Sequence, residues 1–292
     1  DSAGRMRTFP LAPAYDNTKR IDEVVMPDIR YAQNENVDRG DLRMQVIERG
    51  TSTPIDDAKI SISYSGDPDS TVEEVNTDAS GMSETLTLDT PPLELSMQPS
   101  EVQPYAEYTI QVTAKGYRPI NISGIEVFSG QLSLQEIRMD AEEATESMTD
   151  NIVIPAHTLF AEYPPKIAEA EIKPVTETGE IVLSRVVVPE YIVVHDGSPR
   201  DSTAKNYYVK YKDYIKNVAS SEIYATWPAN TIRANVLAIM SFTLNRVYTE
   251  WYRNKGYDFT ITSSTAFDHK WIPERNVYES ISVIVDELFA NY

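Results

Sequence analysis

The chain has 292 residues, of which 26 are basic and 45 acidic, so its formal net charge is −19. That length is enough for two modest domains, each with its own core. The acidic balance argues against a nucleic-acid-binding protein, because neutralising phosphates takes lysine and arginine. The absence of cysteine excludes disulfide scaffolds, zinc–thiolate sites and thiol catalysis. No run of about 18 apolar residues exists, so the sequence predicts no transmembrane segment.

Charge and aromatic residues are unevenly distributed along the chain. Residues 1–190 carry the whole net charge, with 34 acids and 15 bases, whereas residues 191–292 carry 11 of each. The C-terminal part also holds all three tryptophans and 11 of the 18 tyrosines. Such charge asymmetry indicates separate modules. The aromatic enrichment suits either a core or a surface that stacks on sugar rings.

The first elements in chain order are strands. Residues 1–40 show little periodicity and are interpreted as an extended lead-in. Between residues 41 and 140, apolar and polar residues alternate in short runs separated by Gly, Pro, Asp and Ser, which is typical of half-buried antiparallel strands. The runs lie at 42–46, 60–64, 86–88, 108–112 and 132–134. We therefore predict an all-β sandwich at 41–140, with no helix inside it.

The predicted sandwich carries short motifs in a characteristic order. They are Pro54-Ile55, Ala58-Lys59-Ile60, Thr77-Asp78-Ala79-Ser80-Gly81, Tyr108-Thr109-Ile110-Gln111-Val112 and Ala114-Lys115-Gly116-Tyr117. On these motifs, residues 41–140 resemble the carboxypeptidase regulatory-like domain, a prealbumin-like β-sandwich. The resemblance implies a spacer or adhesion module without catalysis, through which protein partners could bind.

Candidate metal ligands are few. An acidic group in the sandwich could bind calcium through oxygen, but the EF-hand spacing is absent and a solvated acidic loop is the favoured interpretation. That group is Asp67, Asp69, Glu73 and Glu74. The histidines lie far apart in sequence, at His157, His195 and His269. The sequence therefore predicts neither a metal site nor a cofactor.

A connector and a second domain follow the sandwich. Residues 141–180 are acidic and rich in proline, which is typical of a stiff, extended connector. Two continuous apolar runs, Ile181 to Val188 and Tyr191 to Val194, are separated by Pro189. Continuous apolar character predicts two strands covered on both faces. They open an α+β domain at 181–292.

Beyond Tyr207 the hydrophobic period changes to that of helices. A helix at 207–224 places Glu222 on its apolar stripe, near its end. Desolvation there would raise the pKa of the carboxyl, as a general acid requires. The alternative is a structural glutamate, paired with a buried arginine or hydrated at the helix end. Further helices are predicted at 229–253 and 276–288, the last opened by a capping-box pair at Asn276 and Glu279.

The helical part carries a second ordered set of motifs. They are Tyr214-Ile215-Lys216-Asn217-Val218-Ala219-Ser220-Ser221-Glu222-Ile223, Trp227-Pro228-Ala229, Gly256-Tyr257-Asp258-Phe259-Thr260 and Glu274-Arg275-Asn276. On these motifs, residues 207–290 resemble the sporulation stage II protein D and amidase-enhancer (SpoIID/LytB-like) family. The chain departs from the family at 263–269, where a Ser/Cys-Gln-Val-Tyr motif is usual. It also lacks the family's closing His-Gly-x-Gly-x-Ser-Gln segment, which predicts a C-terminally incomplete module.

The resemblance implies an activity and a set of site residues. Family members related to the sporulation protein are lytic transglycosylases that cut peptidoglycan glycan strands with one essential glutamate, which corresponds to Glu222. One carboxyl suffices, because the sugar's own 6-hydroxyl attacks the anomeric carbon. Asp258 is the best candidate for a second carboxylate at the site. Tyr224, Trp227 and Tyr257 are candidate sugar-stacking residues, with a place in the core as the alternative for each.

The expected protein is an exported, bacterial, extracellular or cell-wall-associated one that acts on peptidoglycan glycan strands. A start at Asp1 fits either a removed signal peptide or a late start. The alternative function is a non-catalytic structural or binding protein of the cell envelope or a surface assembly. The altered 263–269 segment motivates that alternative. New anhydro-sugar ends on glycan strands would separate the two.

Overall fold

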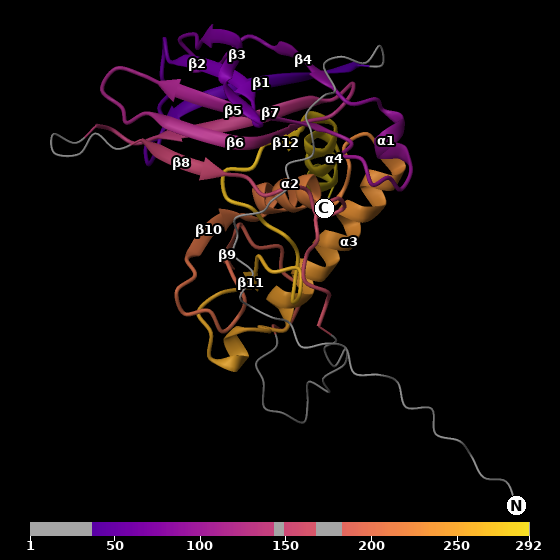
Figure 1. Cartoon of the computed structure of the whole chain (residues 1–292). Helices are drawn as coiled ribbons and strands as arrows, with labels where there is room; N and C mark the ends of the chain where they lie inside the picture. The colour runs from indigo at the N-terminus through magenta and orange to yellow at the C-terminus, as the bar shows by residue number, and fades with distance from the viewer. Residues whose placement is uncertain (1–36, 143–148, 168–182, 292) are drawn as a thin grey trace, which may run out of the picture.

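The computed structural model describes residues 37–142, 149–167 and 183–291. Its N-terminal part is a pair of packed sheets, with strand orders β12-β7-β1-β4 and β3-β2-β5-β6-β8 (Figure 1). The strands of this part are β1 (Asp38–Glu48), β2 (Lys59–Tyr64), β3 (Asp67–Asn76), β4 (Leu86–Thr90), β5 (Ala106–Thr113), β6 (Ile120–Val127), β7 (Leu132–Met139) and β8 (Asp150–Val153). β12 (Val277–Tyr278) comes from the far end of the chain and pairs antiparallel with β7.

The alternating apolar positions form the core between these two sheets. Leu42, Met44 and Val46 of β1 are fully buried, and they share one cluster with Ile60 and Ile110 of the other sheet. Side chains two residues apart lie on the same face of a strand, so period 2 is enough to build this layer. Strands are present where the sequence predicts them within 41–140. The expectation that all are antiparallel was wrong, since β1 pairs in parallel with β7.

One helical turn interrupts the stretch that the sequence predicts to be all β. α1 (Glu94–Met97) follows β4, where Pro91 and Pro92 offer no N–H for further pairing. The Leu93 N–H donates instead to the Asp38 carboxylate at 2.8 Å, and the Ser96 hydroxyl donates to the Leu93 carbonyl at 2.7 Å. The expectation of no helix within 41–140 was therefore wrong by this one turn.

The predicted connector at 141–180 also contains structure that belongs to the sandwich. Residues Asp150–Val153 form β8, which pairs in parallel with β6 along Ile120 to Ser123. Beyond it, the N–H of Ile167 donates to the Ala266 carbonyl at 2.7 Å, so the chain already contacts the C-terminal part there. The rest of the predicted connector, at 143–148 and 168–180, lies outside the described residues.

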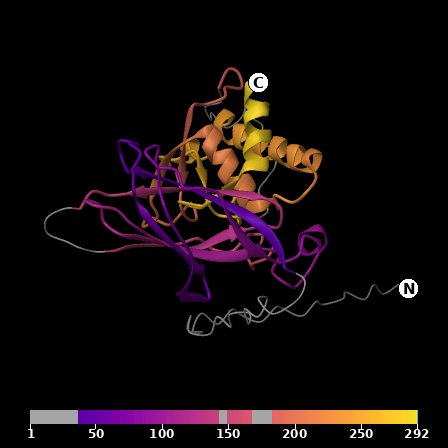
Figure 2. The same cartoon turned by 90° about the horizontal axis from the view of Figure 1, so that it is seen from above.

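The C-terminal part combines a small sheet with three helices. Its sheet has the order β10-β9-β11, built from β9 (Tyr191–His195), β10 (Asn206–Lys210) and β11 (Ile261–Thr262). Its helices are α2 (Tyr211–Glu222), α3 (Ala229–Tyr248) and α4 (Glu279–Ala290), with a 3-10 turn, η2 (Arg253–Lys255), after α3. Figure 2 shows these helices gathered beside the sandwich. The mixed, sheet-rich architecture predicted from the sequence is confirmed.

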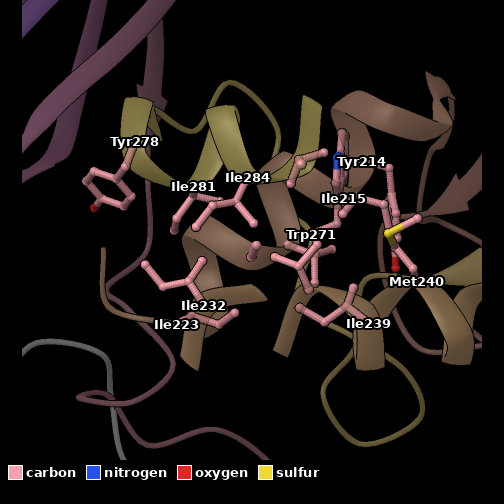
Figure 3. Packing of buried hydrophobic residues seen from close by; sticks show 14 of the residues in the cluster. Tyr214, Ile215, Ile223, Ile232, Ile239, Met240, Trp271, Tyr278, Ile281 and Ile284 are labelled. Carbon is pink, nitrogen blue, oxygen red and sulfur yellow. The ribbon is translucent and has the colours of Figure 1, made fainter. Parts of the chain in front are cut away.

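Apolar stripes from all three helices meet in a second core. Figure 3 shows Ile215 of α2, Ile232 and Met240 of α3, and Ile281 and Ile284 of α4 pointing toward one another. All five are buried. Helices packed on each other in this way derive most of their stability from the shared apolar face.

Several predicted boundaries in this part were wrong. Residues 183–188 form no strand, and Val186 is 60% exposed. The predicted helix at 207–224 begins later, since residues 206–210 pair with β9 as β10. α3 ends at Tyr248, and α4 begins at Glu279 because Val277 and Tyr278 are held by β7.

A buried ion pair joins the sandwich to the C-terminal part. Arg275 donates from both terminal nitrogens to the Glu126 carboxylate of β6, at 3.3 Å to Oε1, and both side chains are fully buried. Tyr278 donates to Glu126 Oε2 at 3.0 Å, and Arg275 Nε donates to the Ser220 carbonyl of α2 at 3.1 Å. Burial alone would lower the pKa of Arg275, but Glu126 and Tyr278 raise it, which keeps the guanidinium charged.

Asn276 extends this joint with its side chain. Its Nδ2 donates to the Glu126 carbonyl at 2.9 Å, and its Oδ1 accepts from the Glu126 N–H at 3.3 Å. The predicted capping box at Asn276 and Glu279 is therefore wrong, since the Asn276 side chain is bonded to β6. An asparagine side chain often caps a helix start. Here it bonds instead to the backbone N–H and C=O of Glu126 in β6, where β6 has no neighbouring strand on that side in the described part of the chain.

Replacing Arg275 with Ala should strongly destabilise the fold. The variant leaves the Glu126 carboxylate buried without a counter-charge, which costs about 3–5 kcal/mol of unfolding free energy. Chemical denaturation measures it. The matched control is Arg233→Ala, which breaks the exposed ion pair with Glu287 and should cost under about 1 kcal/mol. Equal losses in the two variants would contradict the role given to the buried pair.

Glu107 makes stability depend on pH, because it lies directly opposite Glu126 in the β5–β6 register. Burial, and then the Glu126 charge, raises the pKa of Glu107 from 4.5 to about 7. The folded state therefore binds the extra proton between these values, and stability falls as pH rises from 4.5 to about 7. Glu107→Gln removes this loss and should stabilise the protein at about pH 8 by up to about 3 kcal/mol. Thermal unfolding against pH measures it, with exposed Glu73→Gln as a control that keeps the wild-type slope.

Candidate functional site

Glu222 is the last residue of α2, and the chain turns extended at Ile223. The stripe through Tyr214, Ile215 and Val218 is fully buried, as the helical period predicts. The Glu222 side chain itself is 22% exposed, so the helix delivers its carboxylate from the core to the edge of the solvent. Within the described ranges, the carboxylate of Glu222 therefore forms no ion pair with a buried arginine, and it is not left to solvent alone.

Two groups from one loop hold the Glu222 carboxylate. His269 Nδ1 lies 2.9 Å from Oε2, and the Lys270 N–H donates to Oε1 at 2.6 Å. The Nε2 atom of His269 is buried and has no hydrogen-bond partner among the described residues. A bare ring nitrogen is less costly there than an N–H without an acceptor, so we assign the proton to Nδ1, which donates to Glu222.

Asn217, one turn and a half earlier on α2, fixes the loop that supplies these groups. Its Nδ2 donates to the Ile272 carbonyl at 2.7 Å, and its Oδ1 accepts from the Ile272 N–H at 3.0 Å. Because the Asn217 amide bonds both the N–H and the C=O of Ile272, it fixes the position of the loop relative to α2. His269 and Lys270 are thereby held level with Glu222.

Asp268 braces the other end of the loop from a fully buried position. It accepts hydrogen bonds from Arg246 Nε at 2.8 Å, from the Tyr252 hydroxyl at 2.6 Å and from the Thr262 N–H at 2.9 Å. The Thr262 hydroxyl is a fourth donor, at 2.7 Å. Four hydrogen bonds to one buried carboxylate restrict its rotation. The residue next to His269 is therefore rigid.

Aromatic and cationic side chains lie next to the residues that hold the carboxylate. The Phe242 ring meets the His269 ring edge-on at 4.7 Å between centroids, and Lys166 Nζ lies 4.6 Å from the Phe242 centroid. The Lys270 ammonium lies 5.8 Å from the Tyr163 ring. Burial lowers the pKa of Lys270, partly opposed by the charge of Asp196. The site is therefore a single carboxylate held by His269 and the Lys270 N–H.

Two of the predicted sugar-stacking residues contact the sandwich. Tyr224 is buried, with its ring 4.7 Å from His157 and 5.3 Å from Phe128, and burial raises its pKa to about 12. Trp227 donates from its indole nitrogen to the Ser96 carbonyl of α1 at 3.0 Å. In the described residues these contacts are those of packing between the two parts, which is the alternative that the sequence left open.

The other two predicted residues lie beside the small sheet. Asp258 is exposed and accepts from Asn206 Nδ2 at 3.0 Å. Tyr257 packs its ring on Phe259 at 5.0 Å and on Tyr252 at 6.0 Å. The hydrogen bonds and ring contacts described for both residues lead to β9, β10 and their loops, whereas those of Glu222 lead to His269 and Lys270.

His269 and Lys270 are the site residues that the sequence did not predict. His269 lies 47 positions from Glu222 and Lys270 lies 48, so no local pattern links them. One feature of the sequence did draw attention to this segment, the departure from the family motif at 263–269. It did not indicate that the segment contacts Glu222.

No metal centre is found in the part of the chain that the structure describes, since no three His, Cys, Asp or Glu residues there are placed to hold an ion. The acidic group weighed as a calcium site is used otherwise. Glu74, for example, is hydrogen-bonded by Lys59 and Ser61. Over the same described ranges, no helix is long and apolar enough to cross a membrane.

Comparisons with known proteins give no family. No family model and no curated protein matches the chain. Among solved structures, the Bacillus anthracis TIE protein is 15% identical over 36% of this chain and 17% of its own, with a TM-score of 0.25. The 5-hydroxyisourate hydrolase of Klebsiella pneumoniae is 17% identical over 35% of this chain and 92% of its own, with a TM-score of 0.24.

A third similar structure is the catechol 1,2-dioxygenase of Acinetobacter radioresistens, 13% identical over 40% of this chain and 58% of its own, with a TM-score of 0.24. The chain thus spans about a sixth of the TIE protein and over half of the dioxygenase. At these TM-scores none of the three structures bears on what the chain does.

Trp227 provides a test of packing against ligand binding. Trp227→Phe keeps the aromatic ring but removes the indole N–H that bonds Ser96, so it should cost about 1 kcal/mol of unfolding free energy. If Trp227 only packs, glycan binding stays at the wild-type level. A variant of unchanged stability with weakened glycan binding would contradict packing and restore the stacking role. Denaturation and a pull-down on glycan strands measure the two quantities.

Proposed function

We propose that the C-terminal part is a glycan-strand-cleaving, lytic-transglycosylase-like module of an exported bacterial cell-wall protein, with Glu222 as its general acid and base. The observation that carries the proposal is the Glu222 carboxylate itself. It stands at the end of a buried helix, reaches solvent, and is held by His269 and the Lys270 N–H. The motif resemblance at 214–229 points to the same residue independently.

The chemistry needs a proton that can be given and then taken back. In the first step the Glu222–His269 pair, carrying one extra proton, donates it to the glycosidic oxygen as the C–O bond to the leaving sugar breaks. In the second step Glu222 takes the proton of the sugar's own 6-hydroxyl, whose oxygen forms the new bond to the anomeric carbon. The pair ends with the proton it started with, and no water is consumed.

His269 and the loop serve this cycle by holding the carboxylate in position. A hydrogen bond from Nδ1 fixes one oxygen, and the Lys270 N–H fixes the other, so the carboxyl group cannot rotate away from a bound strand. The sandwich then acts as a spacer or as a surface for protein partners.

Glu222→Gln should abolish the acid–base function while keeping the fold. The amide is nearly isosteric and still accepts one hydrogen bond, so we expect a fall in strand cleavage of about two to four orders of magnitude. Anhydro-sugar ends released from purified glycan strands, measured by mass spectrometry, give the rate. Asp213→Asn is the matched control, because it removes an exposed carboxylate from the first turn of the same helix.

Cleavage by Glu222→Gln at the wild-type rate would contradict the proposal. So would glycan strands left intact by the wild-type chain, provided that the strands are cut by an active transglycosylase in a parallel reaction. An Asp213→Asn variant as inactive as Glu222→Gln would place the acid elsewhere on α2.

One observation favours the second candidate, a non-catalytic structural or binding protein of the cell envelope. Both oxygens of Glu222 already accept hydrogen bonds from within the chain, as expected for a carboxylate that ties α2 to the 269–272 loop. That role predicts a measurable loss of stability in Glu222→Gln and binding of wall material without anhydro-sugar products. The cleavage assay therefore decides between the two functions.

A further inference from the structure

A hollow of about 180 Å³ lies in the C-terminal part, where β9 meets the end of α3 and the turn after it. Tyr191, Trp251, Tyr252 and Phe259 contribute aromatic rings to its lining, and Glu250 and Arg253 contribute charged groups. Glu222 is not among the lining residues. Figure 1 shows β9 and β11 in the C-terminal part, below the sandwich.

The lining is built to hold its shape. Trp251 has the Arg246 guanidinium 4.4 Å and the Lys255 ammonium 3.7 Å from its ring centroid, and Arg246 is anchored on Asp268 at 2.8 Å. Tyr252 is buried and donates to the same Asp268 at 2.6 Å. Cations over aromatic faces and a shared buried carboxylate keep these rings in place without a ligand.

Glu250 stands out among the lining residues by its backbone. It follows the last turn of α3 with a φ of 46°, the left-handed region in which a helix end usually has glycine. A residue with a Cβ pays about 1 kcal/mol there. The side chain lies 3.7 Å from Arg253, so the strained position places a carboxylate beside a guanidinium at the rim of the hollow.

Tyr191 supplies the exposed aromatic surface. Its side chain is 48% exposed, although it stands in the central strand of the small sheet. The lining also includes Tyr252 and Phe259, whose rings lie 4.9 Å apart. An exposed aromatic residue and a carboxylate–guanidinium pair in one lining form the combination that sugar recognition needs, since a pyranose has apolar faces and a rim of hydroxyls.

We propose that this hollow is a sugar-binding site, separate from Glu222, which takes one neutral pyranose ring of a polysaccharide. Its volume of about 180 Å³ is small, which suits a single ring. The ring stacks on Tyr191, and its hydroxyls bond to Glu250 and Arg253. The site goes beyond the proposed function, because binding here requires no contribution from Glu222.

A chain of contacts relates the hollow to the candidate catalytic group. The Arg246 guanidinium lies 4.6 Å from the Phe242 ring, which meets His269, which in turn bonds Glu222. A strand anchored by one sugar in the hollow would therefore have its neighbouring sugars close to the same helix, α3, that flanks the carboxylate. Anchoring of this kind raises the local concentration of substrate.

The test is a titration of the full chain with N-acetylglucosamine and with its trisaccharide, followed by NMR of the Trp251 indole N–H. The titration uses the Glu222→Gln background, so that cleavage does not interfere. We expect saturable shifts with a dissociation constant in about the millimolar range, as usual for one small ring. Tyr191→Ala should weaken binding about tenfold.

Two further variants separate recognition from structure. Tyr208→Ala is the matched control, because Tyr208 lies on the neighbouring strand, is 81% exposed and does not line the hollow. It should leave binding unchanged. Glu250→Gly should relieve the left-handed strain and raise thermal stability while weakening binding about tenfold. A merely structural Glu250 would raise stability and leave binding alone.

The proposed site is contradicted if neither sugar shifts the Trp251 signal, or if Tyr191→Ala binds sugar as well as Tyr208→Ala does. It is also contradicted if the wild-type chain and Glu222→Gln differ in whether they bind sugar, because this binding should not depend on Glu222. The proposed function fails separately, through the cleavage assay. Binding in the hollow without strand cleavage would leave a sugar-binding protein, and cleavage without binding in the hollow would leave the Glu222 site as the sole glycan contact.

Discussion

The buried pair of Glu126 and Arg275 is the interaction on which the rest of the structure depends. Neither residue can keep its charge in the core alone, because an unpaired buried charge costs several kcal/mol. Each is supplied by a different part of the chain, so each part needs the other to complete its interior. Tyr278 and Asn276 satisfy the remaining hydrogen-bonding capacity of Glu126, which makes the joint specific in register as well as favourable in charge.

This joint also determines where the candidate site stands. Arg275 donates to the Ser220 carbonyl, two residues before Glu222, so the ion pair holds the last turn of α2 against the sandwich. Asn217 then pairs with Ile272, three residues before Arg275, on the same loop. Asp268 is held on the other side by Arg246, so His269 and Lys270 lie between two fixed residues, Asp268 and Ile272. The geometry around Glu222 follows from packing that has no chemical role of its own.

Much of this fold can be predicted from the sequence where one local period decides the outcome. The alternation around Leu42 to Val46 gives the sandwich strands, and the apolar stripes through Val236 and Ile281 give α3 and α4. The prediction fails where a long-range partner overrides local preference. Asn276 has the sequence pattern of a helix cap but bonds to β6, and Val186 lies in an apolar run but belongs to no strand.

Of the candidate site, only Glu222 could be predicted from the sequence. Glu222 is found from the helix period and from a motif, both of which are local in sequence. Its partners His269 and Lys270 come from a loop whose position is set by Asn217 and Arg275. No sequence pattern near Glu222 therefore predicts these partners. A site whose members lie 47 and 48 positions apart is identified only when those segments are placed in space.

The central claim is that the two parts unfold as one unit because they share the Glu126–Arg275 pair. Native-state hydrogen exchange under increasing denaturant tests it most directly, comparing the slowest amides of β6 with those of α2. The account predicts that both sets reach the same opening free energy and respond to denaturant with the same slope. If α2 opens at a clearly lower free energy while β6 stays protected, the parts are independent and the account is wrong.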